Sequence, residues 1–134
     1  MSGVGMETLV RAALMAWLAE STGLAEMLSS ISEEKPARPT LPWLAIAASS
    51  AVDWSTKTDT GAEVRVSLQL ACRGDLPGDA AALVAALDAA VMAMPAAQAG
   101  FAIVSVRFVK SRSAQTGPTA RAVTVDYRFR VLAA

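Results

Sequence analysis

Strict alternation between apolar and polar side chains marks two stretches of this chain and limits its fold more than any other feature. In the first stretch the apolar positions are Val64, Val66, Leu68 and Leu70. In the second they are Val123, Val125, Tyr127, Phe129 and Val131. Successive side chains of a strand point to opposite faces of its sheet, so each stretch predicts a strand with one face in a core.

Two further strands are predicted from weaker patterns. Residues 43–52 are mostly apolar and follow Leu41-Pro42, where proline biases the preceding residue towards extended geometry, although the alanines leave a helix open. Residues 101–110 predict a strand with one set of side chains inward and Ser105 and Arg107 outward. The inward set is Ala102, Val104, Val106 and Phe108.

Helical spacing of apolar residues appears in three places. Residues 6–18 form an amphipathic pattern, and Ser21 is placed to cap a second, short helix that runs to about Leu28. Residues 79–94 predict a longer helix, which begins with Asp79 at its positive end and is stopped by Pro95.

The order of these elements predicts a single α+β domain over residues 1–134. We expect a four-stranded, largely antiparallel sheet of two hairpins, with the N-terminal helix and the central helix packed on one face. The connecting segments are a proline-rich acidic loop at 29–42 and polar hairpin connections at 53–62 and 111–119. The outer sheet face would carry Arg65, Gln69, Arg107, Arg128 and Arg130.

The composition is apolar for a chain of this size, with 54% hydrophobic residues. An alanine-rich genome, a tightly packed core and apolar surface buried between subunits each explain the excess. No apolar stretch is long enough to predict a membrane span, and the N-terminus does not resemble a signal peptide. The single cysteine, Cys72, excludes an internal disulfide and makes a cytosolic origin the default.

Charge is divided unevenly along the chain although the net charge is zero. Residues 1–100 carry a balance of −5, and residues 101–134 carry +5. Such a chain is suited to head-to-tail contact with copies of itself or to a polyanion. The alternative is that the basic residues only solvate an outer sheet face.

The residues needed for common catalytic chemistry are missing. The sequence contains no histidine, which removes the usual general base, the common nucleophile triads and most zinc, iron and copper sites. No glycine-rich phosphate loop is present, and a lone Cys72 near a strand end is typical of a buried hydrophobe. We therefore predict a protein that is not an enzyme, with no catalytic residues, no cofactor and no metal site.

Trp54 is an aromatic residue within the polar 53–62 connection. It either folds back to close the end of the core or serves as an anchor in an interface. We expect the interface residues to be Trp54, Lys57, Asp59, Arg107, Arg128 and Arg130. Because Phe101, Phe108, Tyr127 and Phe129 fall on apolar faces, nucleic acid would be bound only through its backbone.

Residues 53–70, DWSTKTDTGAEVRVSLQL, resemble the central motif of a family of phage tail-completion, or tail-terminator, proteins. The similarity extends over residues 6–132. Its other elements are the helix pattern at 9–14, Leu41-Pro42-Trp43, the helix around 83–87, and the final Tyr127-Arg128-Phe129-Arg130. Similar proteins are encoded by gene transfer agents, the phage-like particles of alphaproteobacteria.

The resemblance implies a homo-hexameric ring at the head-proximal end of a tail tube, made in the bacterial cytoplasm and incorporated into a virion or phage-like particle. The ring would stop tube polymerisation and dock onto the head–tail connector or stopper protein. DNA would pass through its lumen with non-specific contacts only, and no membrane would be involved. Another head–tail connector or tail-tube component of the same particle is the alternative, ahead of a small ligand-binding domain or enzyme.

Overall fold

The computed structural model describes residues 3–37, 40–74 and 77–134 of the chain. The helices are α1 (Met6–Glu20), α2 (Thr22–Ala25) and α3 (Pro77–Met92). The strands are β1 (Ser30–Ser32), β2 (Trp43–Asp53), β3 (Gly61–Arg73), β4 (Ala97–Gln98), β5 (Phe101–Gly117) and β6 (Ala120–Ala133). Among the described residues, no helix has the length and apolar content that crossing a membrane requires.

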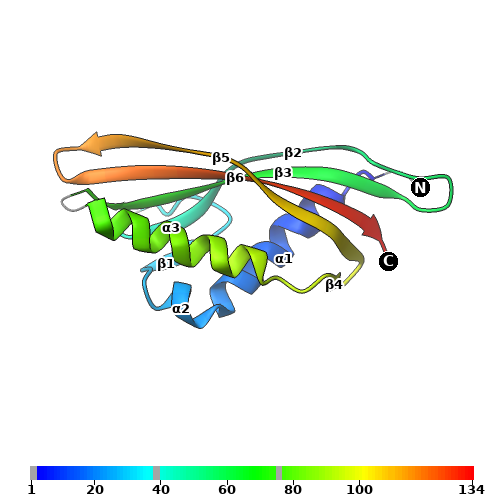
Figure 1. Cartoon of the computed structure of the whole chain (residues 1–134), viewed down its shortest axis with the longest axis horizontal. Helices are drawn as coiled ribbons and strands as arrows, with labels where there is room; N and C mark the ends of the chain where they lie inside the picture. The colour runs from blue at the N-terminus through cyan, green and yellow to red at the C-terminus, as the bar shows by residue number, and fades with distance from the viewer. Residues whose placement is uncertain (1–2, 38–39, 75–76) are drawn as a thin grey trace.

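The strands form one six-stranded sheet in the order β1-β2-β3-β6-β5-β4, in which only the β1–β2 pair is parallel. The helices lie on one side of this long twisted sheet, and the β2–β3 and β5–β6 hairpins extend to opposite ends (Figure 1). The predicted α+β class and N-terminal helix are confirmed. The predicted count of four strands is wrong, because β1 and β4 add short edge strands of three and two residues, too short to show alternation in the sequence.

The core lies between the helices and the inward faces of β3 and β6. Val64, Val66 and Leu68 of β3 and Tyr127 and Phe129 of β6 are 0–1% exposed, as their alternation predicts. The helices meet them with fully buried leucines and valines. These are Val10, Leu14 and Leu18 of α1 and Leu87 and Val91 of α3.

A β-bulge in β5 corrects the predicted orientation of its side chains. Ile103 pairs with Val131 and Ser105 with Arg130, so Val104 is an extra residue in the ladder. Val104 is therefore 54% exposed rather than inward, and Ile103 packs against the core in place of Ala102. Val106 and Phe108 do point inward as predicted. They pair with the buried Phe129 and Tyr127, because the extra residue shifts the alternation of β5 by one position.

β5 also continues past the point where the sequence predicts its end. Residues 111–117, expected to be part of a polar connection, are strand, and only Pro118 and Thr119 join β5 to β6. Ser111 to Thr116 are exposed on both faces of the hairpin. Polar residues on both faces are compatible with a hairpin end that projects into solvent. Because neither face is apolar there, the sequence shows no alternation from which a strand could be predicted.

The 29–42 segment, expected to be a loop, contains β1 and packs on both sides of the sheet. Towards the helices, Glu33 Oε1 accepts a hydrogen bond of 3.1 Å from Nε of Arg11 in α1. On the opposite face, Leu41 packs against a second apolar cluster, which consists of Trp43, Ala45 and Ala71. The segment thus covers the Trp43 end of the face that the helices leave open.

Candidate interaction surface

Three arginines stand side by side on the face of the sheet opposite the helices. Arg128 of β6 is in register with Arg65 of β3 on one side and with Arg107 of β5 on the other. Neighbouring strands are about 4.8 Å apart, so these residues, here called the arginine row, span roughly 10 Å across the sheet. Like charges directly opposite each other destabilise a sheet. The row therefore requires neutralising contacts.

Glu63 supplies the ionic contacts that the row makes. Its Oε2 lies 3.8 Å from Nε of Arg65, and its Oε1 lies 3.9 Å from Nε of Arg128. The same Oε1 accepts a hydrogen bond of 3.2 Å from Nε of Arg130, in the adjacent row. One carboxylate thus faces three arginines. No described acidic group lies within 4.0 Å of Arg107.

The next row along the sheet continues the polar surface. Asp126 of β6 is flanked in register by Ser67 of β3 and Lys110 of β5. A hollow of about 340 Å³ lies here, with Arg65 also in its lining. Among described residues, the buried side-chain atoms without a hydrogen-bond partner are Oδ1 of Asp126 and Nε of Arg128. Both belong to β6 in the centre of this face.

Trp54 lies next to the arginines rather than in the core. The guanidinium carbon Cζ of Arg130 lies 5.5 Å from the centre of the Trp54 ring, a cation–π arrangement. The side chain is half-buried and belongs to neither apolar cluster. Of the two roles expected for it, this position does not favour closure of the core, and a role as an interface anchor stays a prediction.

The structure divides the predicted interface residues into two groups. Trp54, Arg107, Arg128 and Arg130 lie in or beside the arginine row. Lys57 and Asp59 lie in the β2–β3 connection, where the Asp59 amide donates a hydrogen bond of 2.9 Å to Oγ1 of Thr56. A role for either group in an interface stays a prediction. Glu63 was absent from the predicted set, because its contacts with Arg128 and Arg130 depend on strand pairing that no local pattern reveals.

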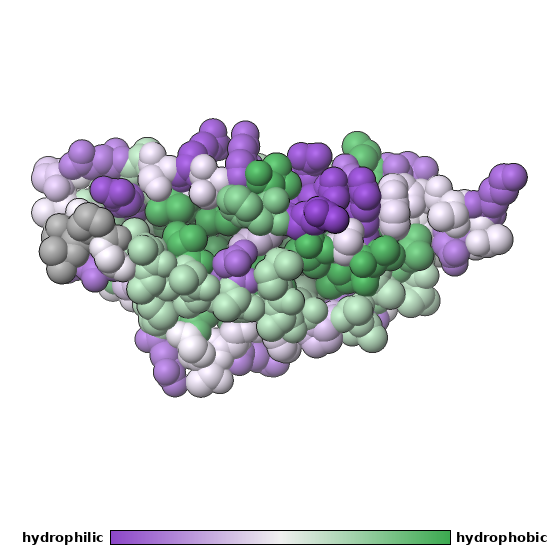
Figure 2. Space-filling model, in the orientation of Figure 1, coloured by the Kyte–Doolittle hydropathy of each residue, from purple (hydrophilic) through white to green (hydrophobic). Residues whose placement is uncertain are grey.

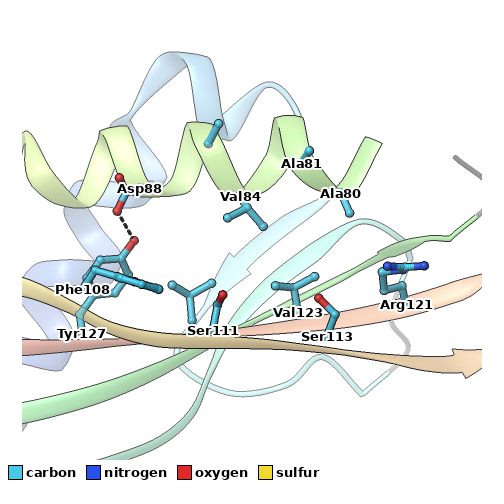
Figure 3. A pocket seen from close by; sticks show the side chains of 12 residues that line it. Ala80, Ala81, Val84, Asp88, Phe108, Ser111, Ser113, Arg121, Val123 and Tyr127 are labelled. Atoms are coloured by element: carbon cyan, nitrogen blue, oxygen red, sulfur yellow. Dashed lines mark hydrogen bonds between the residues drawn. The ribbon is translucent and has the colours of Figure 1, made fainter. Parts of the chain in front are cut away.

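On the helix side, a groove of about 630 Å³ runs between α3 and the β5–β6 hairpin (Figure 3). Val84 of α3 faces Val123 of β6 across it, with Arg121 towards one end and Phe108 towards the other. Phe108 is 53% exposed and meets the Tyr127 ring edge-on. Figure 2 shows hydrophobic side chains where α3 meets the sheet, below a band of hydrophilic ones. The groove was not predicted from the sequence.

The described residues offer little to support catalytic chemistry. They include no cluster of three or more histidine, cysteine, aspartate or glutamate side chains arranged to hold a metal ion. Cys72 is 2% exposed, and burial raises the pKa of its thiol despite the opposing charge of Arg121. A thiol with a raised pKa is a poor nucleophile, which agrees with a packing role for Cys72.

Two solved structures share this fold. A chain in the virion of a native gene transfer agent particle superposes with a TM-score of 0.77 at 19% identity, covering 96% of this chain and 98% of that chain. The gp17 protein of bacteriophage SPP1 gives a TM-score of 0.55 at 19% identity, covering 93% of this chain and 94% of that one. No curated protein sequence matches the chain.

The family model described as tail completion protein gp17 matches residues 12–132, which is nearly the whole chain. The predicted resemblance is confirmed, and with it the expected location in a phage-type particle. The description of the family names a role in tail completion. The chain belongs to the tail completion protein gp17 family.

Proposed function

We propose that this chain is a single tail-terminator domain that closes into a homo-hexameric ring at the head-proximal end of a tail tube. The ring stops tube polymerisation, docks onto the head–tail connector or stopper protein, and lets DNA pass through its lumen. The chain catalyses no reaction and needs no cofactor in this role. Family membership supports the place in the tail, and the number of subunits rests on the resemblance alone.

The observation that carries the ring is the pair of open edges on opposite sides of the sheet. At one edge, β1 pairs with β2 only over Trp43–Ala45, and at the other, β4 pairs with β5 only over Phe101–Ala102. Within the described chain, residues 47–53 and 104–117 therefore have a strand neighbour on one side only. Unpaired strand edges are templates for pairing with another chain.

The two open edges belong to different parts of the subunit, β2 at one and β5 at the other. A contact between two different surfaces of identical subunits is heterologous, and it closes into a ring when the rotation per subunit permits. The β5 side of one subunit would thus meet the β2 side of the next.

Native mass spectrometry of the purified chain, alone and with its tail-tube protein, tests this proposal. A closed hexamer is the expected species, alone or in the presence of tube protein. An open series of growing oligomers would instead favour a tail-tube component. A strict monomer under both conditions would contradict the ring.

A further inference from the structure

We propose that the arginine row, together with the cations beside it on β5, binds the phosphate backbone of double-stranded DNA. In the proposed ring, this would make the helix-free face of the sheet the lining of the lumen. The placement in a lumen rests on the proposed function. The binding of DNA by this face does not, and it is measurable on the chain in any oligomeric state.

The arginine row leaves positive charge uncompensated within the chain. Glu63 is shared among Arg65, Arg128 and Arg130, while Arg107 has no described acidic group within 4.0 Å. Guanidinium groups held in register repel one another, which costs stability unless an anion lies against them. The negatively charged groups of a bound polyanion would neutralise these arginines, of which Arg65 and Arg128 have Glu63 as their described acidic partner.

The cations also continue along β5. Beyond Arg107, the residues on the same face are Lys110, in register with Asp126, and Arg112, in register with Thr124. Residues on one face of a strand follow one another at about 6.8 Å, and the bulge at Val109 adds to one of these steps. The result is a two-dimensional array of cations. Among the described residues, the carboxylates that lie within this array are those of Glu63 and Asp126. Such an array suits a repeating phosphate backbone.

The make-up of this face favours nucleic acid over an acidic protein. Protein interfaces concentrate apolar and aromatic residues and arginine, and they are depleted in lysine, glutamate and aspartate. Here Lys110 and Asp126 stand beside the arginine row with a single large apolar residue among those described, Val109, exposed in the lining of their hollow. The exposed Val52 stands on β2, two strands from Arg128. The large aromatic side chain nearby, Trp54, lies against Arg130. Among the described residues of this face no fully exposed aromatic ring is available to stack on bases, so binding would be independent of sequence.

Fluorescence anisotropy with a labelled DNA duplex of arbitrary sequence, titrated between 50 and 200 mM salt, tests the proposal, since that range resolves phosphate contacts. The test variant is Arg65→Gln/Arg107→Gln, which spares the half-buried Arg128. The matched control is Arg121→Gln, on the opposite face of β6 and in the lining of the groove. Circular dichroism verifies the fold of each variant, and light scattering records its oligomeric state in the same buffer.

We expect the double variant to lower the slope of log affinity against log salt by about 1.8, or about 0.9 for each lost phosphate contact. Arg121→Gln should leave the slope unchanged, and a second duplex of unrelated sequence should bind equally well. Row-dependent binding by a monomer would support this inference while contradicting the ring. A ring that binds no DNA at 50 mM salt, or binds it equally well without the row, would overturn the inference and indicate an acidic protein partner.

Discussion

The hydroxyl of Tyr127 donates a hydrogen bond of 2.7 Å to Oδ1 of Asp88, joining the centre of β6 to α3. Tyr127 itself is fully buried, so its ring packs in the core while its hydroxyl reaches a carboxylate at the edge of the groove (Figure 3). A buried hydroxyl needs a partner, because leaving it unpaired costs about 1–3 kcal/mol. The bond therefore fixes how α3 lies on the sheet.

This bond predicts an alkaline limit to stability. Burial, the hydrogen bond to Asp88 and the negative charge of Asp88 all raise the pKa of Tyr127 above its ordinary value. The unfolded chain loses this proton near pH 10 whereas the folded chain keeps it, so stability is complete below pH 10 and falls as pH rises further. Tyr127 is the sole tyrosine, so absorbance at the phenolate band reports it directly.

The folded protein should show no tyrosinate at pH 10.5, whereas the chain in urea should be largely ionised there. Tyr127→Phe should cost about 1 kcal/mol at neutral pH and make stability less sensitive to pH above 10. If the Tyr127 hydroxyl of the native protein lost its proton at the same pH as in the unfolded chain, its burial and its hydrogen bond to Asp88 would be contradicted.

Burial along α1 predicts unequal effects for two leucines of one helix. Leu14 is 0% exposed, and Leu14→Ala should lower the free energy of unfolding by about 2–5 kcal/mol through lost burial and a cavity. Leu9 is 42% exposed, and Leu9→Ala should cost less than about 1 kcal/mol. Urea denaturation of both variants measures the difference. Equal losses would mean that α1 presents a different face to the sheet.

Gly61, at the start of β3, has no room for a side chain. A Cβ there would lie 2.7 Å from the Trp54 and Val131 carbonyl oxygens and from Cδ2 of Leu132. Gly61→Ala should therefore destabilise the chain by about 1–3 kcal/mol, as overpacking does. Gly23→Ala in α2 meets nothing within 4 Å and should stabilise the chain by about 0.4–1 kcal/mol. Thermal melts compare the two, and a tolerated Gly61→Ala would contradict this close packing.

The β2–β3 connection provides a test of the ring contacts. Trp54→Ala combined with Lys57→Glu should impair ring formation or docking, because it removes the aromatic surface over Arg130 and reverses a charge in the connection. Circular dichroism should show an intact fold, since Trp54 lies outside both apolar clusters. Native mass spectrometry reads the oligomer, and an unchanged hexamer would remove these residues from the interface.

Alternation predicts the strands whose two faces meet different surroundings. β3 and β6 have helices on one face and none on the other, so their sequences show the period-2 pattern clearly. The pattern fails in β5, where a bulge inserts Val104 and where residues 111–116 are exposed whichever face they lie on. β1 and β4 are too short for any period to appear.

The sequence predicts which face of its strand each arginine of the candidate site occupies, but not which arginines lie side by side. The outward direction of Arg107, Arg128 and Arg130 follows from alternation within single strands. Their alignment with Arg65, and the contacts of Arg128 and Arg130 with Glu63, depend on the register between strands that are distant in sequence. The groove likewise depends on where α3 lies across β6. No pattern within one element carries that information.

Electron microscopy of particles assembled with and without this chain tests the tail-terminator role most directly. Without it, tubes should grow beyond their normal length or remain unattached to heads, and adding the purified protein should restore both properties. Particles of normal tail length, with heads attached and with this chain absent, would contradict the role.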